Sequence, residues 1–321
     1  MAEPSSDRMS ASESSTGGSS SSTSTMTSTS FEPLKWLFLF VCLALAGLSN
    51  WAVIAYTHDF VPRHPLPDIM FALMPEQKWA SVGGDMCVVV NLVCFGLLLF
   101  FHVHRTVILR RILFTTACLY GMRSVTLTAT QLPSAYTNNS QKCRPQVDSQ
   151  ASVFFSRWLE QSIRLGFQEK NYMLCGDLLF SGHTLVMVNC ALFVAYYLPR
   201  RIRFLQWATN IPAAFGMLCM TISRTHYTID VIIAYWLTNF VFRIYHAYCE
   251  VDIYMERRKS ILHSWWPCKV IDWLEENIVP GRIENVFSMP FVRRLDPSML
   301  QKAVSRQHTK QISISSSSTL P

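Results

Sequence analysis

The chain has 321 residues, of which 50% are hydrophobic, and it carries a formal net charge of +7. The charge does not indicate binding to nucleic acid, because the basic residues stand in short segments beside long apolar runs, which is the pattern of membrane topology. The ten cysteines do not form a disulfide framework, since most of them lie inside apolar runs, where cysteine behaves as a small hydrophobic residue. The composition therefore predicts a membrane protein.

The polar residues are concentrated at the two ends of the chain. The N-terminal segment consists mostly of serine, threonine and other small polar residues, and the last dozen residues are similar. Such segments cannot bury enough apolar surface to fold. We expect a disordered cytoplasmic tail over residues 1–33, a membrane domain over 34–250 and a cytoplasmic tail over 251–321. The apolar run that begins at Leu34 is expected to act as the insertion signal.

Six apolar runs approach the length of about 20 residues that a helix needs to cross a bilayer. They cover residues 34–56, 82–102, 112–132, 178–198, 204–222 and 227–248. Basic segments follow the second, fourth and sixth runs, and such segments stay in the cytoplasm. The sequence thus predicts an all-α membrane protein with six transmembrane helices and both termini in the cytoplasm. The loops after the first, third and fifth runs then face the lumen or the exterior.

The loop after the third run has two features that concern the compartment it faces. It carries a glycosylation sequon at Asn138, which agrees with a lumenal or exterior position. Cys143 and Cys175 flank the loop, and the sequence leaves open whether they form a disulfide.

The segment after the sixth run contains several tryptophans among charged residues. This composition is typical of a segment that lies on the membrane surface. Cys249 and Cys268 stand near the membrane, and the sequence leaves open whether they are palmitoylated. The tryptophans are Trp265, Trp266 and Trp273.

Three ionisable residues stand at the lumenal ends of predicted spans. His183 lies near the start of the fourth span, and His226 and Asp230 lie at the start of the sixth. The spacing of four residues places His226 and Asp230 on one face of a helix. A carboxylate there fixes the tautomer of the imidazole and leaves its other nitrogen as a nucleophile. With His183 as acid and base, the three residues suit phosphoryl transfer through a phosphohistidine, and the alternative is polar packing between helices.

Arg123 lies deep in the third span, about 18 Å along the helix from the basic segment at Arg111. An arginine at this depth needs an anion, and the phosphate of a lipid is the expected one. The alternative is an internal ion pair with Asp85 or Asp230. Tyr120 stands one turn before Arg123 and is a candidate to assist it.

The residues before His183 suit an anion. Ser181 and Gly182 offer backbone N–H groups close to a helix start, where a phosphate is favoured. Asp177 stands near the same helix start, either as a cap or in contact with a lipid headgroup. The sequence shows no metal-ligand spacing, and we expect neither a metal nor another cofactor.

These residues belong to four ordered motifs, and the chain from about residue 60 to 290 resembles the sphingomyelin synthase family, which is related to the lipid phosphate phosphatases. The resemblance is carried by Pro65-Leu-Pro-Asp68; by Arg110-Arg111, Tyr120, Arg123, Thr126, Thr130 and Leu132-Pro133; by Cys175-Gly-Asp177 with Ser181-Gly-His-Thr184; and by His226-Tyr-Thr-Ile-Asp230 with Ala234-Tyr235.

The resemblance implies six spans and a lumenal or exoplasmic active site with His183, His226 and Asp230 as the catalytic triad. The implied reaction moves phosphocholine from phosphatidylcholine to ceramide and yields sphingomyelin and diacylglycerol. His226 would attack phosphorus, while His183 would protonate the diacylglycerol oxygen and then deprotonate ceramide. The expected partners are these lipids and, in addition, a second copy of the chain. The expected location is the Golgi, the plasma membrane or both.

Other functions remain open from the sequence. The residues Ser223-Arg224-Thr225 differ from the Ala-His-acid sequence of vertebrate relatives, so a synthase that takes phosphatidylethanolamine is an alternative. A lipid phosphate phosphatase is another, although its arginine usually stands several residues before the second histidine, and Arg224 is only two residues before His226. A six-span transporter or scaffold, in which the histidines are structural, is the alternative that is not an enzyme.

Overall fold

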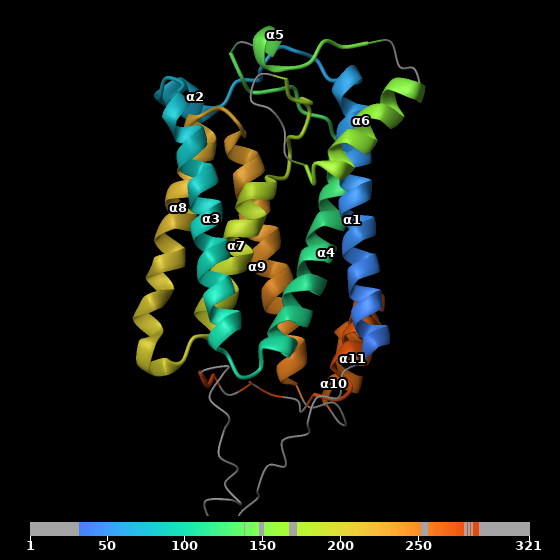
Figure 1. Ribbon diagram of the computed structural model, residues 1–321, viewed down its shortest axis with the longest axis vertical. Coiled ribbons are helices and arrows are strands. Elements are labelled where there is room, and N and C mark those ends of the chain that lie inside the picture. Colours follow the sequence, from blue (N-terminus) through green and yellow to red (C-terminus); the bar gives the residue numbers. More distant parts are fainter. Residues whose placement is uncertain are drawn as a thin grey trace, which may run out of the picture.

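The computed structural model describes residues 32–288, apart from residues 138, 148–150, 167–171, 252–255, 279–280, 282 and 284. Nearly all of the N-terminal tail, the end of the C-terminal tail and the sequon residue Asn138 lie outside the described residues. Within them, every regular element is a helix (Figure 1). This confirms the all-α class.

Six long helices, which run side by side in Figure 1, correspond to the six apolar runs. They are α1 (Pro33–Phe60), α3 (Lys78–Phe101), α4 (Arg105–Ala129), α7 (Gly182–Tyr197), α8 (Trp207–Ile222) and α9 (Thr228–Glu250). Among the described residues, α1 and α3 are long and apolar enough to cross a membrane, and α7 is a shorter apolar helix. The helices α7 and α8 have 16 residues each, or about 24 Å, which is less than the hydrocarbon core of about 30 Å. Six crossings therefore stay a prediction.

The long helices pack in pairs: α1 lies against α4, α3 against α7 and α8, and α7 against α9. Two glycines allow close approach between them. A Cβ atom on Gly84 of α3 would lie 2.2 Å from the Met220 side chain of α8, and one on Gly216 of α8 would lie 2.5 Å from the Met187 sulfur of α7. Small residues at such crossings bring backbones together, which compensates for the weak hydrophobic drive between helices in lipid.

Two elements within the long loop between α4 and α7 were missed by the sequence analysis. They are α5 (Asn139–Lys142) and α6 (Ala151–Ile163), which lie at the same end of the bundle as α2 (Ile69–Leu73) (Figure 1). α6 packs against α1; it buries Arg157 and leaves Phe155, Leu159 and Ile163 exposed at helical spacing. This periodicity is that of an amphipathic helix.

A disulfide joins Cys143 to Cys175 and closes the loop that carries α6. It answers the question that the sequence left open. The bond fixes the residue that directly precedes Gly176 and Asp177 in the third family motif.

The other end of the bundle carries the 3-10 helices η1 (Arg200–Gln206) and η2 (Ile261–Ser264) together with α10 (Glu256–Lys259) and α11 (Trp266–Glu275). α11 is held by Glu275, which accepts hydrogen bonds from Arg111 Nε at 3.0 Å and Arg111 Nη2 at 2.5 Å. Both side chains are buried, so the loss of either partner leaves an uncompensated charge in the protein interior.

The tryptophans of the C-terminal segment differ in their exposure, and the position of this segment on a membrane surface stays a prediction. Trp265 and Trp266 are exposed, whereas Trp273 packs against a buried cluster that contains Cys268. Cys249 and Cys268 are both buried, so neither sulfur is open to acylation in this conformation.

Candidate functional site

The two histidine motifs meet because α7 packs against α9. His183 is the second residue of α7, and His226 stands just before the first turn of α9. Their ring centroids are 6.1 Å apart with the rings edge to face. Residues from separate motifs, about forty positions apart in the sequence, therefore stand side by side.

His226 faces the carboxylate of Asp230, with Nδ1 at 3.5 Å from Oδ2. The sequence analysis placed this pair on one helical face, but His226 precedes α9, and the chain turns at Tyr227 to bring the two side chains together. Asp230 is fully buried, and its Oδ2 accepts the N–H of Tyr227 at 2.9 Å. Neither His226 Nδ1 nor Asp230 Oδ1 has a hydrogen-bond partner within the described structure. Catalytic contacts are often this long in a site without substrate and tighten when it binds.

His183 has a carboxylate partner of its own. Its Nε2 lies 3.3 Å from Asp85 Oδ1, and both side chains are about half exposed. Asp85 stands on α3, and the sequence analysis considered it only as a partner of Arg123. A charged residue inside an apolar run is costly and marks a candidate functional site. The sequence therefore indicated that Asp85 has a function, but it did not indicate that His183 is its partner.

Arg123 of α4 is buried and donates hydrogen bonds to three partners. Its Nε donates to the carbonyl oxygen of Phe180 at 2.6 Å, and its other nitrogens donate to Asn50 and Asp177. The internal ion pair that the sequence left as an alternative thus exists, but with Asp177 in place of Asp85 or Asp230. A Cβ atom on Gly182 would lie 3.7 Å from the guanidinium, which places this charge beside the start of α7.

Ser181 is the N-cap of α7: its hydroxyl accepts the N–H of Thr184 at 3.3 Å. The N–H of Ser181 donates to the carbonyl oxygen of Asp230 at 3.4 Å, which ties the start of α7 to the first turn of α9. The first N–H groups of a helix have no partner within it, and in α7 these belong to Gly182 and His183. Such a helix start favours an anion.

Two further predicted residues flank the site. Tyr120 lies against the cluster of Leu119 and Phe180 and is near enough to Arg123 and Asp177 to interact with their charges. Within the part of the chain that the structure describes, no group of three His, Cys, Asp or Glu side chains is arranged to hold a metal ion.

Arg224, which the sequence analysis noted as a departure, turns toward α2. Its guanidinium lies 4.9 Å from the ring centre of Phe71 and donates to the Phe71 carbonyl oxygen at 3.3 Å. Its φ of +56° is in the left-handed region, which costs a residue other than glycine about 1 kcal/mol. The structure therefore places this arginine in the turn before His226 and against α2.

Comparison with known proteins agrees with this geometry. Residues 174–247, which contain both histidine motifs, match the family described as PAP2 superfamily C-terminal. The matched segment therefore contains His183, His226 and Asp230.

Longer matches define the family. The chain is 59% identical over 307 residues to the putative phosphatidylcholine:ceramide cholinephosphotransferase 3 of Caenorhabditis elegans, which covers 90% of each chain. It is 35% identical to phosphatidylcholine:ceramide cholinephosphotransferase 2 of the same organism, over 81% of this chain and 78% of the relative. It is 27% identical to the human sphingomyelin synthase-related protein 1, over 85% and 65%. The chain belongs to the sphingomyelin synthase family and is a phosphotransferase, which confirms the resemblance.

Proposed function

We propose that this protein transfers phosphocholine from phosphatidylcholine to ceramide through a phosphohistidine at His226. The observation that supports this most is the convergence of His183 and His226 at 6.1 Å, each beside its own carboxylate. The names of the C. elegans relatives supply the donor and the acceptor.

In the first half of the reaction, Nε2 of His226 attacks the phosphorus of phosphatidylcholine. Nδ1 faces Asp230, whose negative charge offsets the positive charge that forms on the ring. The bond between phosphorus and the glycerol oxygen breaks, and His183 gives that oxygen its proton. Diacylglycerol leaves, and phosphocholine stays on the His226 nitrogen.

In the second half, the primary hydroxyl of ceramide gives its proton to His183, and its oxygen attacks the same phosphorus. The bond between phosphorus and nitrogen breaks, so that sphingomyelin forms and both histidines return to their starting states. Arg123 and the free N–H groups at the start of α7 are positioned to balance the negative charge on the phosphoryl oxygens. Asp85 holds His183 between the two proton transfers.

The site lies at the end of the bundle opposite α11, and the basic segments favour the cytoplasm for the α11 end. We infer a multi-pass protein of the Golgi or the plasma membrane with a lumenal or exoplasmic active site and cytoplasmic termini. A homo-oligomer is part of the same proposal.

The test is a headgroup-transfer assay in membranes that contain the full chain. Fluorescent ceramide is supplied with either phosphatidylcholine or phosphatidylethanolamine as the only donor. The His226→Ala variant removes the nucleophile, and His64→Ala, an exposed histidine outside the site, is the matched control. We expect product from phosphatidylcholine that disappears in His226→Ala and persists in His64→Ala.

Other outcomes would replace the proposal. Product from phosphatidylethanolamine alone would keep the mechanism and change the donor. Release of diacylglycerol without a ceramide product would indicate a hydrolase, and the absence of turnover with both donors would favour a structural role for the histidines. Acid-labile phosphate on the wild-type chain, lost in His226→Ala, is the expected mark of the intermediate.

A further inference from the structure

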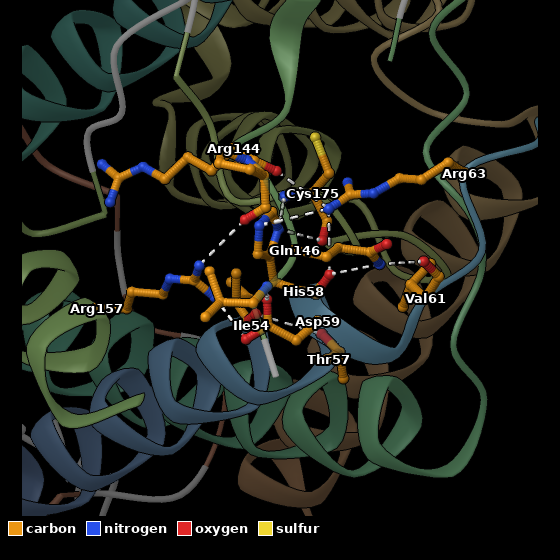
Figure 2. A network of polar contacts seen from close by, with 12 residues as sticks. Ile54, Thr57, His58, Asp59, Val61, Arg63, Arg144, Gln146, Arg157 and Cys175 are labelled. Atoms are coloured by element: carbon orange, nitrogen blue, oxygen red, sulfur yellow. Dashed lines mark hydrogen bonds and ion pairs between the residues drawn. The ribbon is translucent and has the colours of Figure 1, made fainter. Parts of the chain in front are cut away.

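His58, in the last turn of α1, has no part in the mechanism above, yet it is the most completely buried histidine of the described chain. Its ring faces the backbone of Cys175, as Figure 2 shows. The Cys175 N–H donates to His58 Nδ1 at 2.8 Å, and the Cys175 carbonyl oxygen lies 3.2 Å from the same nitrogen. A side chain of α1 thus holds the backbone that leads into the third family motif.

The shorter of the two contacts identifies the role of His58 Nδ1. One ring nitrogen cannot accept an N–H and donate a proton at once, and the contact with the Cys175 N–H is the shorter of the two. Nδ1 therefore accepts the Cys175 N–H, and the other ring nitrogen, Nε2, lies 3.5 Å from the Arg63 guanidinium. Nδ1 is the essential part of the residue, because without it the Cys175 N–H would be buried and unpaired, which costs about 1–3 kcal/mol.

The segment after Cys175 lies directly on the end of α1. Gly176 has a φ of +119°, and a Cβ atom there would lie 3.2 Å from Thr57 Oγ1 and 3.3 Å from Val61 Cγ2. The next residue is Asp177, which pairs with Arg123 beside the start of α7. Only Gly176 therefore separates Cys175, which bonds to His58, from Asp177, which pairs with Arg123.

The surrounding contacts fix both ends of the long loop to α1. The disulfide ties Cys175 to Cys143, and Gln146 Nε2 donates to the Val61 carbonyl oxygen at 2.9 Å (Figure 2). Arg157 of α6 pairs with Asp59 at 2.6 Å. The side chain of His58 lies at the centre of these contacts. Within the described structure, it is the only hydrogen-bond acceptor of the Cys175 N–H.

We propose that His58 is a positioning residue for headgroup transfer, because it fixes the backbone from which Asp177 reaches Arg123. The inference rests on the proposed function, since it takes the charge pair at the start of α7 as the phosphate site. A displacement of about 1 Å at such a site lowers turnover by up to about 100-fold. We expect the effect on kcat and not on KM, because His58 is fully buried and lies against the Cys175 backbone.

The experiment compares two substitutions in the full chain. His58→Leu fills the space without an acceptor, whereas His58→Asn places an amide oxygen near the position of Nδ1. His246→Leu is the control for loss of a buried histidine: His246 lies toward the far end of α9, where its nitrogens contact the Phe242 carbonyl oxygen and the Tyr197 hydroxyl. Two quantities are measured for folded protein: the kinetics of transfer, and the hydrogen exchange of the amides in residues 172–181.

We expect His58→Leu to increase exchange in this segment and to lower kcat by about 10-fold to 100-fold with an unchanged KM for ceramide. His58→Asn restores both quantities, and His246→Leu leaves both at wild-type values. Normal exchange in His58→Leu, or increased exchange with kcat within twofold of wild type, would overturn the proposal. Absence of transfer by the wild-type chain would refute the proposed function instead, while the exchange data still report whether His58 holds the segment.

Discussion

The substitution Asp230→Asn tests the central pair of the site. Under the proposed mechanism His226 becomes positively charged when it bonds to phosphorus, and the Asp230 carboxylate lies 3.5 Å from its Nδ1. At an effective dielectric constant of about 20, two unit charges at this distance attract by about 5 kcal/mol. Since each 1.4 kcal/mol corresponds to a factor of ten in rate, we expect kcat to fall by about 10³-fold to 10⁴-fold.

The same substitution should leave the fold intact. Asp230 Oδ2 accepts the Tyr227 N–H, and an asparagine oxygen accepts it equally well. Asp230→Ala removes this acceptor too, so we expect it to be inactive and also less stable by about 1 kcal/mol. Asp230→Asn therefore isolates the charge from the cap.

The assay measures transfer from phosphatidylcholine to fluorescent ceramide under saturating donor, together with the thermal unfolding midpoint in detergent. Asp272→Asn, a carboxylate at the opposite end that accepts from the Tyr248 hydroxyl, is the control and should keep normal kcat. An Asp230→Asn variant with normal stability and a kcat within tenfold of wild type would refute the electrostatic reasoning.

Three further predictions follow from other contacts. Asp85→Asn removes the partner of His183, and we expect a loss of about 10²-fold in kcat and a changed acidic limb in the pH profile of kcat; an unchanged profile would contradict a role for Asp85. Glu275→Gln leaves the buried charge of Arg111 uncompensated, so thermal or chemical unfolding should show a loss of about 3–5 kcal/mol, and a loss below about 1 kcal/mol would argue against this docking of α11. The pKa of Glu160 is lowered, chiefly by hydrogen bonds from Arg144 and despite the opposing effect of burial. A lowered pKa stabilises the fold above the unfolded value, so the stability difference between wild type and Glu160→Gln should be full at pH 7 and decline as the pH falls below about 4.5 and through the folded pKa; a difference that stays constant to pH 3 would contradict this.

Much of the fold could be predicted because apolar runs of this length form helices wherever they occur. The bundle of long helices follows from that rule. The helix α6 was missed because its exposed Phe155, Leu159 and Ile163 alternate with buried polar residues, including Arg157, and its length falls below that of a span. The docking of α11 depends on a contact between Arg111 and Glu275, which are 164 positions apart in the sequence. Local sequence patterns do not predict contacts between residues so far apart.

The site was predictable to a similar degree. His183, His226 and Asp230 stand at the starts of predicted spans on one side, and the topology alone brings them to the same end. The partners of His183 and Arg123 were not predictable, since Asp85 and Asp177 are both near the required depth and only the packing of α3, α4 and α7 decides between them. His58 gave no signal at all, because its function lies in a bond to a main-chain amide.

The 6.1 Å separation of the His183 and His226 rings has a kinetic consequence under the proposed mechanism. Both histidines then act on one phosphorus atom, so the departing diacylglycerol and the arriving ceramide must use the same position in turn. After diacylglycerol leaves and before ceramide binds, phosphocholine stays bonded to the His226 nitrogen. This nitrogen is beside His183, whose side chain is 45% exposed. A water molecule that reaches this position can replace ceramide, so the fraction of headgroups lost as free phosphocholine depends on how fast ceramide arrives.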